Sequence, residues 1–302
     1  MFIKEIVEYL CSIGIDVIVH GNKDFKIETF CSIKDIKPNA ITFIRDITSI
    51  NLDKIIAKRN ILVICEKKIE ADFTQICVEN PHRTFFKIIE NFFYRRKHLN
   101  VPEKAVIQTE NIGENLMVGP FTFIDEEVII GSNCIIGANV TIEGKVKIGN
   151  DVIIESGARI GTWGFGHYLN DDGTNSMIPH LGGVIIGDHS FVGANTIISR
   201  GTLSDTVIGE NVLIDGLCYI AHNARIGDRV MIAGGAGVAG SAVIGADSWI
   251  SPRCVINTGT SIGTNCFIGI NGIVTKDIPD NQYATGIPAK VIKENNDKKY
   301  KI

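Results

Sequence analysis

The sequence predicts a mainly β protein: a left-handed parallel β-helix of about eight coils, preceded by a small α/β domain. Isoleucine or valine recurs at every sixth residue over most of the region from 112 to 274. The first hundred residues lack this spacing and show helical and strand-like apolar patterns instead. A six-residue repeat fits neither the 3.6-residue period of a helix nor the two-residue period of a plain strand.

The α/β domain is predicted over residues 1–102. Apolar residues at helical spacing predict a helix over residues 3–14, and Asn80 with Pro81 provides the N-cap and first turn of a second helix over 82–93. Short apolar runs predict strands at residues 27–33, 40–44, 61–67 and 74–80. Residues 94–104 form the expected linker.

The β-helix is predicted over residues 103–279. Each hexad supplies one short strand and one turn, three hexads close a triangular coil, and the aliphatic residue points inward. Twenty-four hexads make eight coils, which at ~4.8 Å between neighbouring strands gives a prism roughly 38 Å tall. Each buried aliphatic side chain contributes ~1.5–3 kcal/mol, so the stacked aliphatic columns stabilise this domain.

Four of the eight cysteines follow the same register. Cys134, Cys218, Cys254 and Cys266 each come four residues after an inward aliphatic, so we expect small buried core residues and not nucleophiles. The chain contains no C-x-x-C pair and no zinc-like spacing of cysteine to histidine. This cysteine usage favours a reduced, cytoplasmic compartment and predicts no metal site.

Two interruptions of the repeat lie at residues 165–184 and 203–206. Insertions in a β-helix project from its corners, and such loops are where binding residues are usually presented. The tail, residues 280–302, is polar and charged and is predicted to form only a short cap or helix.

Charge and hydropathy exclude two classes of partner. Thirty basic and 34 acidic side chains give a formal charge of -4, which provides no broad cationic surface for nucleic acid or anionic lipid. No apolar run reaches the ~18–20 residues of a membrane helix. We therefore expect a protein without a signal peptide, a membrane span or a nucleic-acid partner.

His222 is the histidine that the register singles out. In the hexad "IAHNAR" the inward residue is Ile220, so His222 points away from the core, and Gly240 lies one coil later at the same position. An outward imidazole beside an accessible backbone N–H suits acyl transfer from a thioester, with the imidazole as base and the N–H as oxyanion donor. A solvent-exposed turn histidine is the equal alternative at this stage.

Residues 192–241, containing "IAHNARIGDRVMIAGGAGVAGS", resemble the core of the UDP-3-O-acylglucosamine N-acyltransferases of lipid A biosynthesis, which are trimeric hexapeptide-repeat enzymes. The similarity extends through "IPHLGGVIIG", "ITFI" and "VENPHRTFF". It implies His222 as general base, Gly240 as oxyanion contact and Asp215 as a supporting residue near the base and the sugar. It also implies a homotrimer with its site between subunits, a nucleotide-sugar substrate, and acyl-CoA or acyl carrier protein as cosubstrate without a permanently bound cofactor.

Further substrate contacts are expected from the same resemblance. Phe43 matches the aromatic residue on which the nucleotide base stacks, and Asp46 and Ser49 stand where the family has an asparagine and a tyrosine. The remaining candidate substrate-binding residues are His167, His180, Arg200 and Asn223.

The tail "VTKDIPDNQYATGIPAKVI" resembles the closing segment of acetyl-CoA-dependent hexapeptide transferases. That likeness implies that Lys290 contacts a phosphate of the coenzyme. An equal alternative is that this segment is purely structural and that Pro288 ends the last coil.

The predicted function is transfer of an acyl group from a thioester to the amine of a nucleotide-linked amino sugar, feeding a bacterial surface glycan or lipid. Within enzymes, the alternatives are a strict lipid A enzyme that uses a 3-hydroxyacyl carrier protein and an acetyl-CoA-dependent acetylase of a deoxyamino sugar. A non-catalytic scaffold is the alternative outside enzymes. A three-histidine metal site is disfavoured, because Ser204 and Gly240 stand one coil either side of His222 if the four-residue insertion is ignored.

Overall fold

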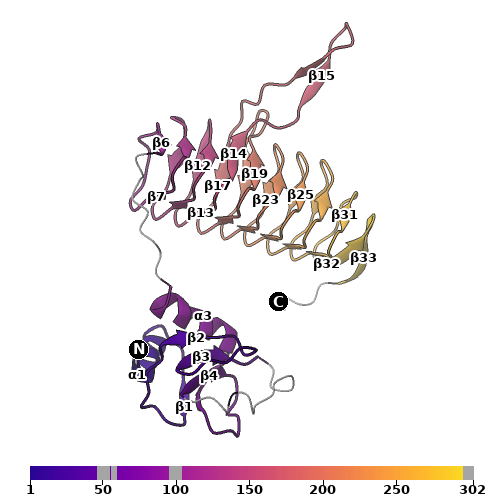
Figure 1. Ribbon diagram of the computed structural model, residues 1–302. Coiled ribbons are helices and arrows are strands. Elements are labelled where there is room, and N and C mark those ends of the chain that lie inside the picture. The colour runs from indigo at the N-terminus through magenta and orange to yellow at the C-terminus, as the bar shows by residue number, and fades with distance from the viewer. Residues whose placement is uncertain (46–54, 56–59, 95–103, 295–302) are drawn as a thin grey trace. The chain divides into compact units, whose positions relative to one another are not determined.

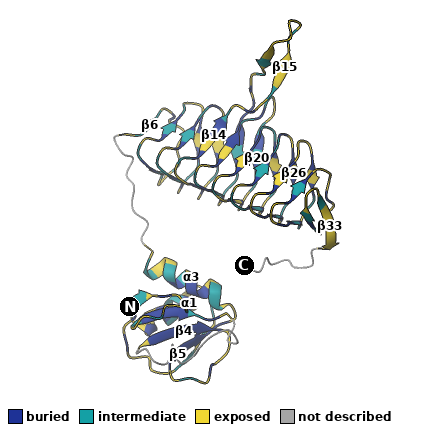
Figure 2. Cartoon of the chain, turned by 45° about the vertical axis from the view of Figure 1, so that its right-hand side comes forward, coloured by how far each residue is buried: buried dark blue, intermediate teal, exposed yellow. Residues whose placement is uncertain are grey.

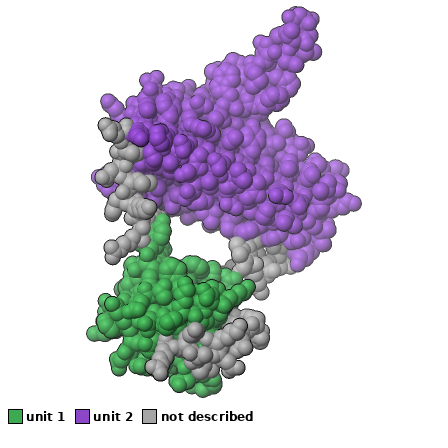
Figure 3. All heavy atoms as spheres, viewed as in Figure 1, with its two compact units in different colours: residues 1–97 green, residues 98–302 purple. Residues whose placement is uncertain are grey.

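The chain folds into two compact units, residues 1–97 and 98–302 (Figure 3). The computed structural model describes residues 1–45, 55, 60–94 and 104–294. The predicted boundary at 102/103 lies outside the described residues. No helix in the described ranges is long and apolar enough to cross a membrane.

Unit 1 is an α/β sandwich built on a five-stranded sheet of order β1-β5-β4-β3-β2 (Figure 1). Strand β1 is antiparallel to β5 and the other neighbours are parallel. The elements are α1 (Ile3–Ser12), β1 (Ile18–His20), β2 (Thr29–Phe30), β3 (Ala40–Phe43), β4 (Ile61–Cys65), β5 (Thr74–Cys77) and α3 (Pro81–Phe92). Both predicted helices and all four predicted strands are confirmed, and β1 is an additional strand.

The predicted N-cap of α3 is also confirmed. The Asn80 side chain accepts a hydrogen bond from the Arg83 N–H at 2.9 Å, and Pro81 occupies the first turn. Helix α3 packs on β3 and β4 and against α1, so its buried Phe85 and Ile88 join the core formed by the sheet.

Unit 2 is the predicted parallel β-helix, with three sheets as its faces (Figure 1). Face 1 contains β7 (Met117–Val118), β10 (Ile135–Ile136), β13 (Ile153–Ile154), β18 (Phe191–Val192), β21 (Leu213–Ile214), β24 (Met231–Ile232), β27 (Trp249–Ile250), β30 (Phe267–Ile268), β32 (Gln282–Gly286) and β33 (Ala289–Glu294). Face 2 contains β6 (Val106–Ile107), β8 (Phe123–Ile124), β11 (Thr141–Ile142), β14 (Arg159–Thr162), β19 (Ile197–Ser199), β22 (Tyr219–Ile220), β25 (Gly237–Val238), β28 (Val255–Ile256) and β31 (Ile273–Val274). Face 3 contains β9 (Ile129–Ile130), β12 (Val146–Ile148), β17 (Val184–Ile186), β20 (Thr206–Ile208), β23 (Arg225–Ile226), β26 (Val243–Ile244) and β29 (Ser261–Ile262).

The register of the coils confirms the hexad analysis. Ile136 pairs with Ile154 and Ile214 with Ile232, each eighteen residues apart. The inward aliphatics form one continuous buried cluster along unit 2. Ile112 departs from the pattern, because it lies at the open first coil and is 37% exposed.

The predicted count of eight coils is too low. Face 2 alone has nine parallel strands. Strand β6 precedes the first hexad of the repeat, and β32 continues face 1 beyond the last hexad. Both segments lack an uninterrupted six-residue spacing, so the repeat did not reveal them.

The four register cysteines are buried as predicted, each at most 2% exposed. Burial raises the pKa of all four thiols, because desolvation disfavours the thiolate. They are inert core residues, and all eight cysteines of the chain are free.

The long insertion projects from the β-helix as predicted, but as an ordered hairpin. Strands β15 (His167–Leu169) and β16 (Asn175–Met177) pair antiparallel and extend away from the coils (Figure 1). Most of this hairpin is exposed (Figure 2). In the tail, β32 and β33 form an antiparallel hairpin that joins the end of face 1, so its described residues form strands and no helix.

Candidate functional site

His222 lies in the turn after β22, at the corner between faces 2 and 3. The next residue, Asn223, has a φ of 62°, the left-handed conformation that this tight corner requires. Ile220 and Ala224 on either side point into the core and are fully buried. The imidazole is therefore carried outward by the register, and it is half-buried.

Gly240 lies one coil further on, directly against the imidazole. A Cβ added to Gly240 would lie 2.7 Å from Cε1 of His222 and 2.8 Å from Nε2. No side chain fits in that space, so glycine is required for the ring to occupy its place. The predicted juxtaposition of His222 and Gly240 is present.

The N–H of Gly240 has no hydrogen-bond acceptor among the residues that the structure describes. At the same position of the hexad on another corner of the prism, which follows face 3, the N–H donates to a side chain of the next coil: Ser132 N to Asn150, Glu210 N to Asp228, and Thr264 N to Asp280, at 2.8–2.9 Å. The Gly240 amide is thus an unused backbone donor beside Nε2 of His222.

Asn223 fixes the tautomer of His222. Its Oδ1 accepts a hydrogen bond from Thr202 N–H at 3.1 Å, and its Nδ2 donates to the carbonyl oxygen of Ser204 at 2.8 Å, which assigns the two ends of the amide. Nδ1 of His222 lies 3.1 Å from this Oδ1, so Nδ1 carries the proton. Nε2, next to Gly240, keeps its lone pair and can act as a base.

Asn223 therefore supports the base and the 203–206 insertion. Its substrate-binding role stays a prediction.

The long insertion returns to this corner through Gly164 and His180. A Cβ on Gly164 would lie 2.6 Å from Cδ2 of His222 and 2.8 Å from Nε2 of His180. The two imidazoles meet edge to face, with centroids 5.4 Å apart and an angle of 72°. Trp163 stacks at a tilt on His180 at 6.1 Å. His222 is thus bordered by Gly240 of the next coil on one side and by the two ends of the insertion, Gly164 and His180, on the other.

Two further polar candidates, one at this corner and one at the opposite end of face 2, are bonded to backbone groups. Arg200 donates from Nε to the carbonyl of Gly161 and from Nη2 to that of Glu143 at 2.9 Å. Asp215 lies at the other end of face 2, where Oδ1 accepts from Gly216 N–H at 2.7 Å and Oδ2 from Gly234 N–H at 3.1 Å.

Within one chain, the described contacts do not join Asp215 to His222. Arg200 holds the corner beneath the insertion, and its described bonds go to protein carbonyls.

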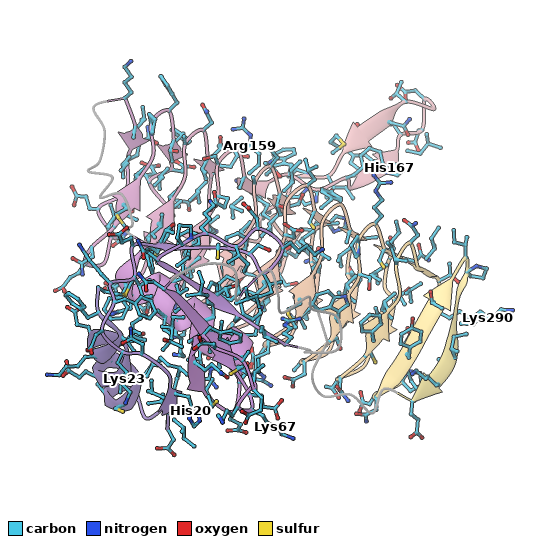
Figure 4. The ribbon with its side chains drawn as sticks, turned by 60° about the horizontal axis from the view of Figure 1, so that its bottom comes forward. His20, Lys23, Lys67, Arg159, His167 and Lys290 are labelled. Carbon is cyan, nitrogen blue, oxygen red and sulfur yellow. The ribbon has the colours of Figure 1, made fainter. Side chains whose placement is uncertain are left out.

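Two candidates have no described contact with His222. Figure 4 shows His167 on the projecting hairpin and Lys290 on the last strands of unit 2. His167 is exposed, and its ring contacts Phe165 at 5.3 Å. Lys290 is exposed on β33 opposite Thr285.

In unit 1, Phe43 lies at the end of β3 in an aromatic cluster. Its ring is 4.9 Å from Phe85, 5.3 Å from His82 and 6.0 Å from Phe86. Burial, with Arg45 nearby, lowers the pKa of His82. Asp46 and Ser49 lie outside the described residues. Phe86 is 51% exposed, so this cluster presents an open aromatic surface of the kind on which a base can stack.

Sequence reasoning missed Gly164 and Trp163, which help to enclose His222. Neither residue follows the hexad register, and their approach to His222 depends on the path of the insertion. In the described part of the chain, no group of three or more His, Cys, Asp or Glu side chains is arranged to hold a metal ion.

Comparison with known proteins gives consistent matches. Residues 111–144, 127–162 and 205–240 match the bacterial transferase hexapeptide (six repeats) model, and residues 183–216 match the hexapeptide repeat of succinyl-transferase. A UDP-3-O-acylglucosamine N-acyltransferase from Coxiella burnetii is 34% identical over 88% of this chain and 83% of its own length. The enzyme of that name from Hydrogenovibrio crunogenus is 32% identical over 77% and 72%.

Solved structures show the same architecture. A UDP-N-acetylglucosamine acyltransferase from Bacteroides fragilis superimposes with a TM-score of 0.59 at 29% identity, covering 65% of this chain and 75% of that one. An Acinetobacter baumannii structure, with a TM-score of 0.58 at 24% identity over 64% and 74%, supports the fold alone.

Proposed function

The chain belongs to the UDP-3-O-acylglucosamine N-acyltransferase family, and from this we propose that it moves an acyl group from a thioester to the amine of a nucleotide-linked amino sugar. One observation carries the proposal: the free Nε2 of His222 lies against Gly240, whose N–H has no acceptor in the described ranges. A base and an oxyanion donor at one point are what direct acyl transfer needs.

The reaction follows from this arrangement. The sugar nitrogen attacks the thioester carbonyl carbon, and the carbonyl electrons move to oxygen, where the Gly240 N–H stabilises the oxyanion by about 2.7–4 kcal/mol. Nε2 of His222 takes one proton from that nitrogen. The intermediate then collapses, the C–S bond breaks with its electron pair on sulfur, and the imidazolium returns the proton to give a free thiol and an amide.

Unit 1 supplies the nucleotide site in this proposal. The half-buried face of Phe43 and the exposed ring of Phe86 support stacking of the base. The donor is acyl-CoA or acyl carrier protein, neither of which is a permanently bound cofactor. Lys290 is a candidate phosphate contact for the donor, since its ammonium is exposed on the last strands. The free cysteines support a cytoplasmic location.

A homotrimer is supported by the outer surface of face 1. Its outward residues are apolar or aromatic in every coil, whereas faces 2 and 3 carry Arg159, Lys147 and Arg225 at outward positions. The column consists of Met117, Ile135, Ile153, Phe191, Leu213, Met231, Trp249, Phe267 and Tyr283. A continuous apolar strip of this length is typical of a surface covered by another copy.

The test is an assay of the full-length protein with four substrate pairs. A 3-hydroxyacyl carrier protein and acetyl-CoA are each offered with UDP-3-O-acylglucosamine and with a dTDP-amino sugar, and amide formation is followed by mass spectrometry together with release of thiol. The lipid A pair, 3-hydroxyacyl carrier protein with the UDP sugar, is expected to turn over. Absence of turnover with all four pairs would contradict the proposal.

His222→Ala tests the base. We expect kcat to fall at least ~10²-fold, because the alanine cannot accept the proton from nitrogen. His20→Ala, on β1 of unit 1, is the matched control and should retain the wild-type rate. An unchanged kcat in His222→Ala would favour a non-catalytic role for this corner.

A further inference from the structure

Segment 163–181, which contains the projecting part of the insertion, has two buried residues, and both border His222. Between Trp163 and Leu181 every other residue is at least partly exposed, whereas Gly164 is buried and His180 is 2% exposed. An insertion that only projected into solvent would need no such contact. The two ends of the projecting segment therefore pack against the imidazole of His222.

The protonation state of His180 follows from its neighbours. Nδ1 lies 2.8 Å from the carbonyl oxygen of Ile178, which can only accept, so Nδ1 carries the proton. Nε2 then carries a lone pair, and this atom is buried without a hydrogen-bond partner among the described residues. Burial lowers the pKa of His180, and the charged or titratable groups beside it, His222 and Arg200, act in the same direction.

The unpaired Nε2 lies at the edge of His222. It and Cδ2 of His222 border the same glycine, because a Cβ on Gly164 would lie 2.8 Å from the first and 2.6 Å from the second. Trp163 covers the other side of His180. In the described ranges no carboxylate contacts His222, whose Nδ1 instead pairs with the neutral amide of Asn223.

We propose that His180 is a positioning residue for the acyl transfer: its Nε2 lone pair stabilises the imidazolium that His222 forms, and its ring holds that imidazole over Gly240. This inference rests on the proposed function. The transferred proton stays on Nε2 of His222 until it passes to the leaving sulfur, and His180 neither gains nor loses one. Because the contact acts on a charge that exists only during the reaction, it increases kcat without tightening substrate binding.

The test compares His180→Phe with His180→Gln in steady-state kinetics. Phenylalanine keeps an aromatic ring but has no lone pair, so we expect kcat to fall at least about tenfold while both KM values stay within about twofold. The glutamine amide can place an acceptor oxygen near the position of Nε2, and we expect it to restore most of the rate. His20→Phe and His20→Gln are matched controls, and thermal melting and sedimentation confirm that each variant is folded.

Each other outcome is decisive. An unchanged kcat in His180→Phe, a rise in KM alone, or a glutamine variant as slow as the phenylalanine variant overturns the role of the lone pair.

If His180→Phe does not fold, His180→Asn replaces it. The asparagine amide nitrogen can still donate to the carbonyl of Ile178, and no atom of asparagine occupies the position of Nε2. The same fall in kcat is expected. A wild-type protein without turnover overturns the proposed function, whereas an active wild type with unaffected variants overturns this inference alone.

Discussion

At the residue scale, two glycines give His222 its place. Gly240 and Gly164 lie on different sides of the imidazole, and an added Cβ on either would come within 2.7 Å of an atom of His222. Real Cβ atoms do not approach so closely, so neither position accepts a side chain without moving the ring. The site therefore requires glycine at both positions as well as the imidazole itself.

Gly240→Ala should therefore inactivate the enzyme while leaving it folded. The new methyl group displaces the imidazole, and a misplacement of about 1 Å at a reacting group can cost ~10²-fold in kcat. Gly237→Ala is the matched control, because a Cβ there meets nothing within 4 Å. Steady-state kinetics of both variants check this. Equal rates for the two would show that the ring is not confined by Gly240.

At the element scale, the hexad register predicted which residues of each coil point inward or outward. It did not predict the contacts that the insertions make with the coils. The register placed the inward aliphatics, the four core cysteines and the outward direction of His222, since each follows from a position within one coil. It could not place Gly164 and His180 against His222, because the path of segment 163–181, which contains most of the long insertion, depends on tertiary contacts. The register likewise could not predict that Arg200 and Asn223, which stay candidate substrate-binding residues, bond to the backbone of neighbouring turns.

Strands β4 and β5 provide a prediction about thiol chemistry. Cys65 and Cys77 are register partners with sulfur atoms 3.7 Å apart. Burial, reinforced by Cys77, raises the pKa of Cys65 to about 12. At pH 8 the Cys65 thiol stays protonated and unreactive.

A thiol reagent such as dithionitrobenzoate should therefore label one cysteine rapidly in the native protein, namely the exposed Cys11. All eight cysteines should react in guanidinium chloride. Rapid labelling of Cys65 in the native protein, mapped by peptide mass spectrometry, would contradict the buried β4–β5 pair.

At the scale of the whole molecule, the outward column of face 1 predicts how subunits associate. Met231→Lys places an ammonium in the middle of this column, where a neighbouring copy would have to bury it. We expect sedimentation velocity to show dissociation into monomers. Val243→Lys adds the same charge to face 3, at a position 38% exposed, and should leave the assembly intact. Dissociation in both variants would argue against face 1 as the interface.

The antiparallel direction of β33 affects whether one molecule can pair end-to-end with another. A parallel ladder that ended on a bare strand would offer its unpaired N–H and C=O groups as a template for the next molecule, the geometry from which fibrils extend. Here the final strand of face 1 runs antiparallel to β32 and carries the exposed charges of Lys290, Lys293 and Glu294. A second prism that approached face 1 end-on would meet a strand of opposite polarity and its three exposed charges, so the last hairpin disfavours end-to-end extension of this face.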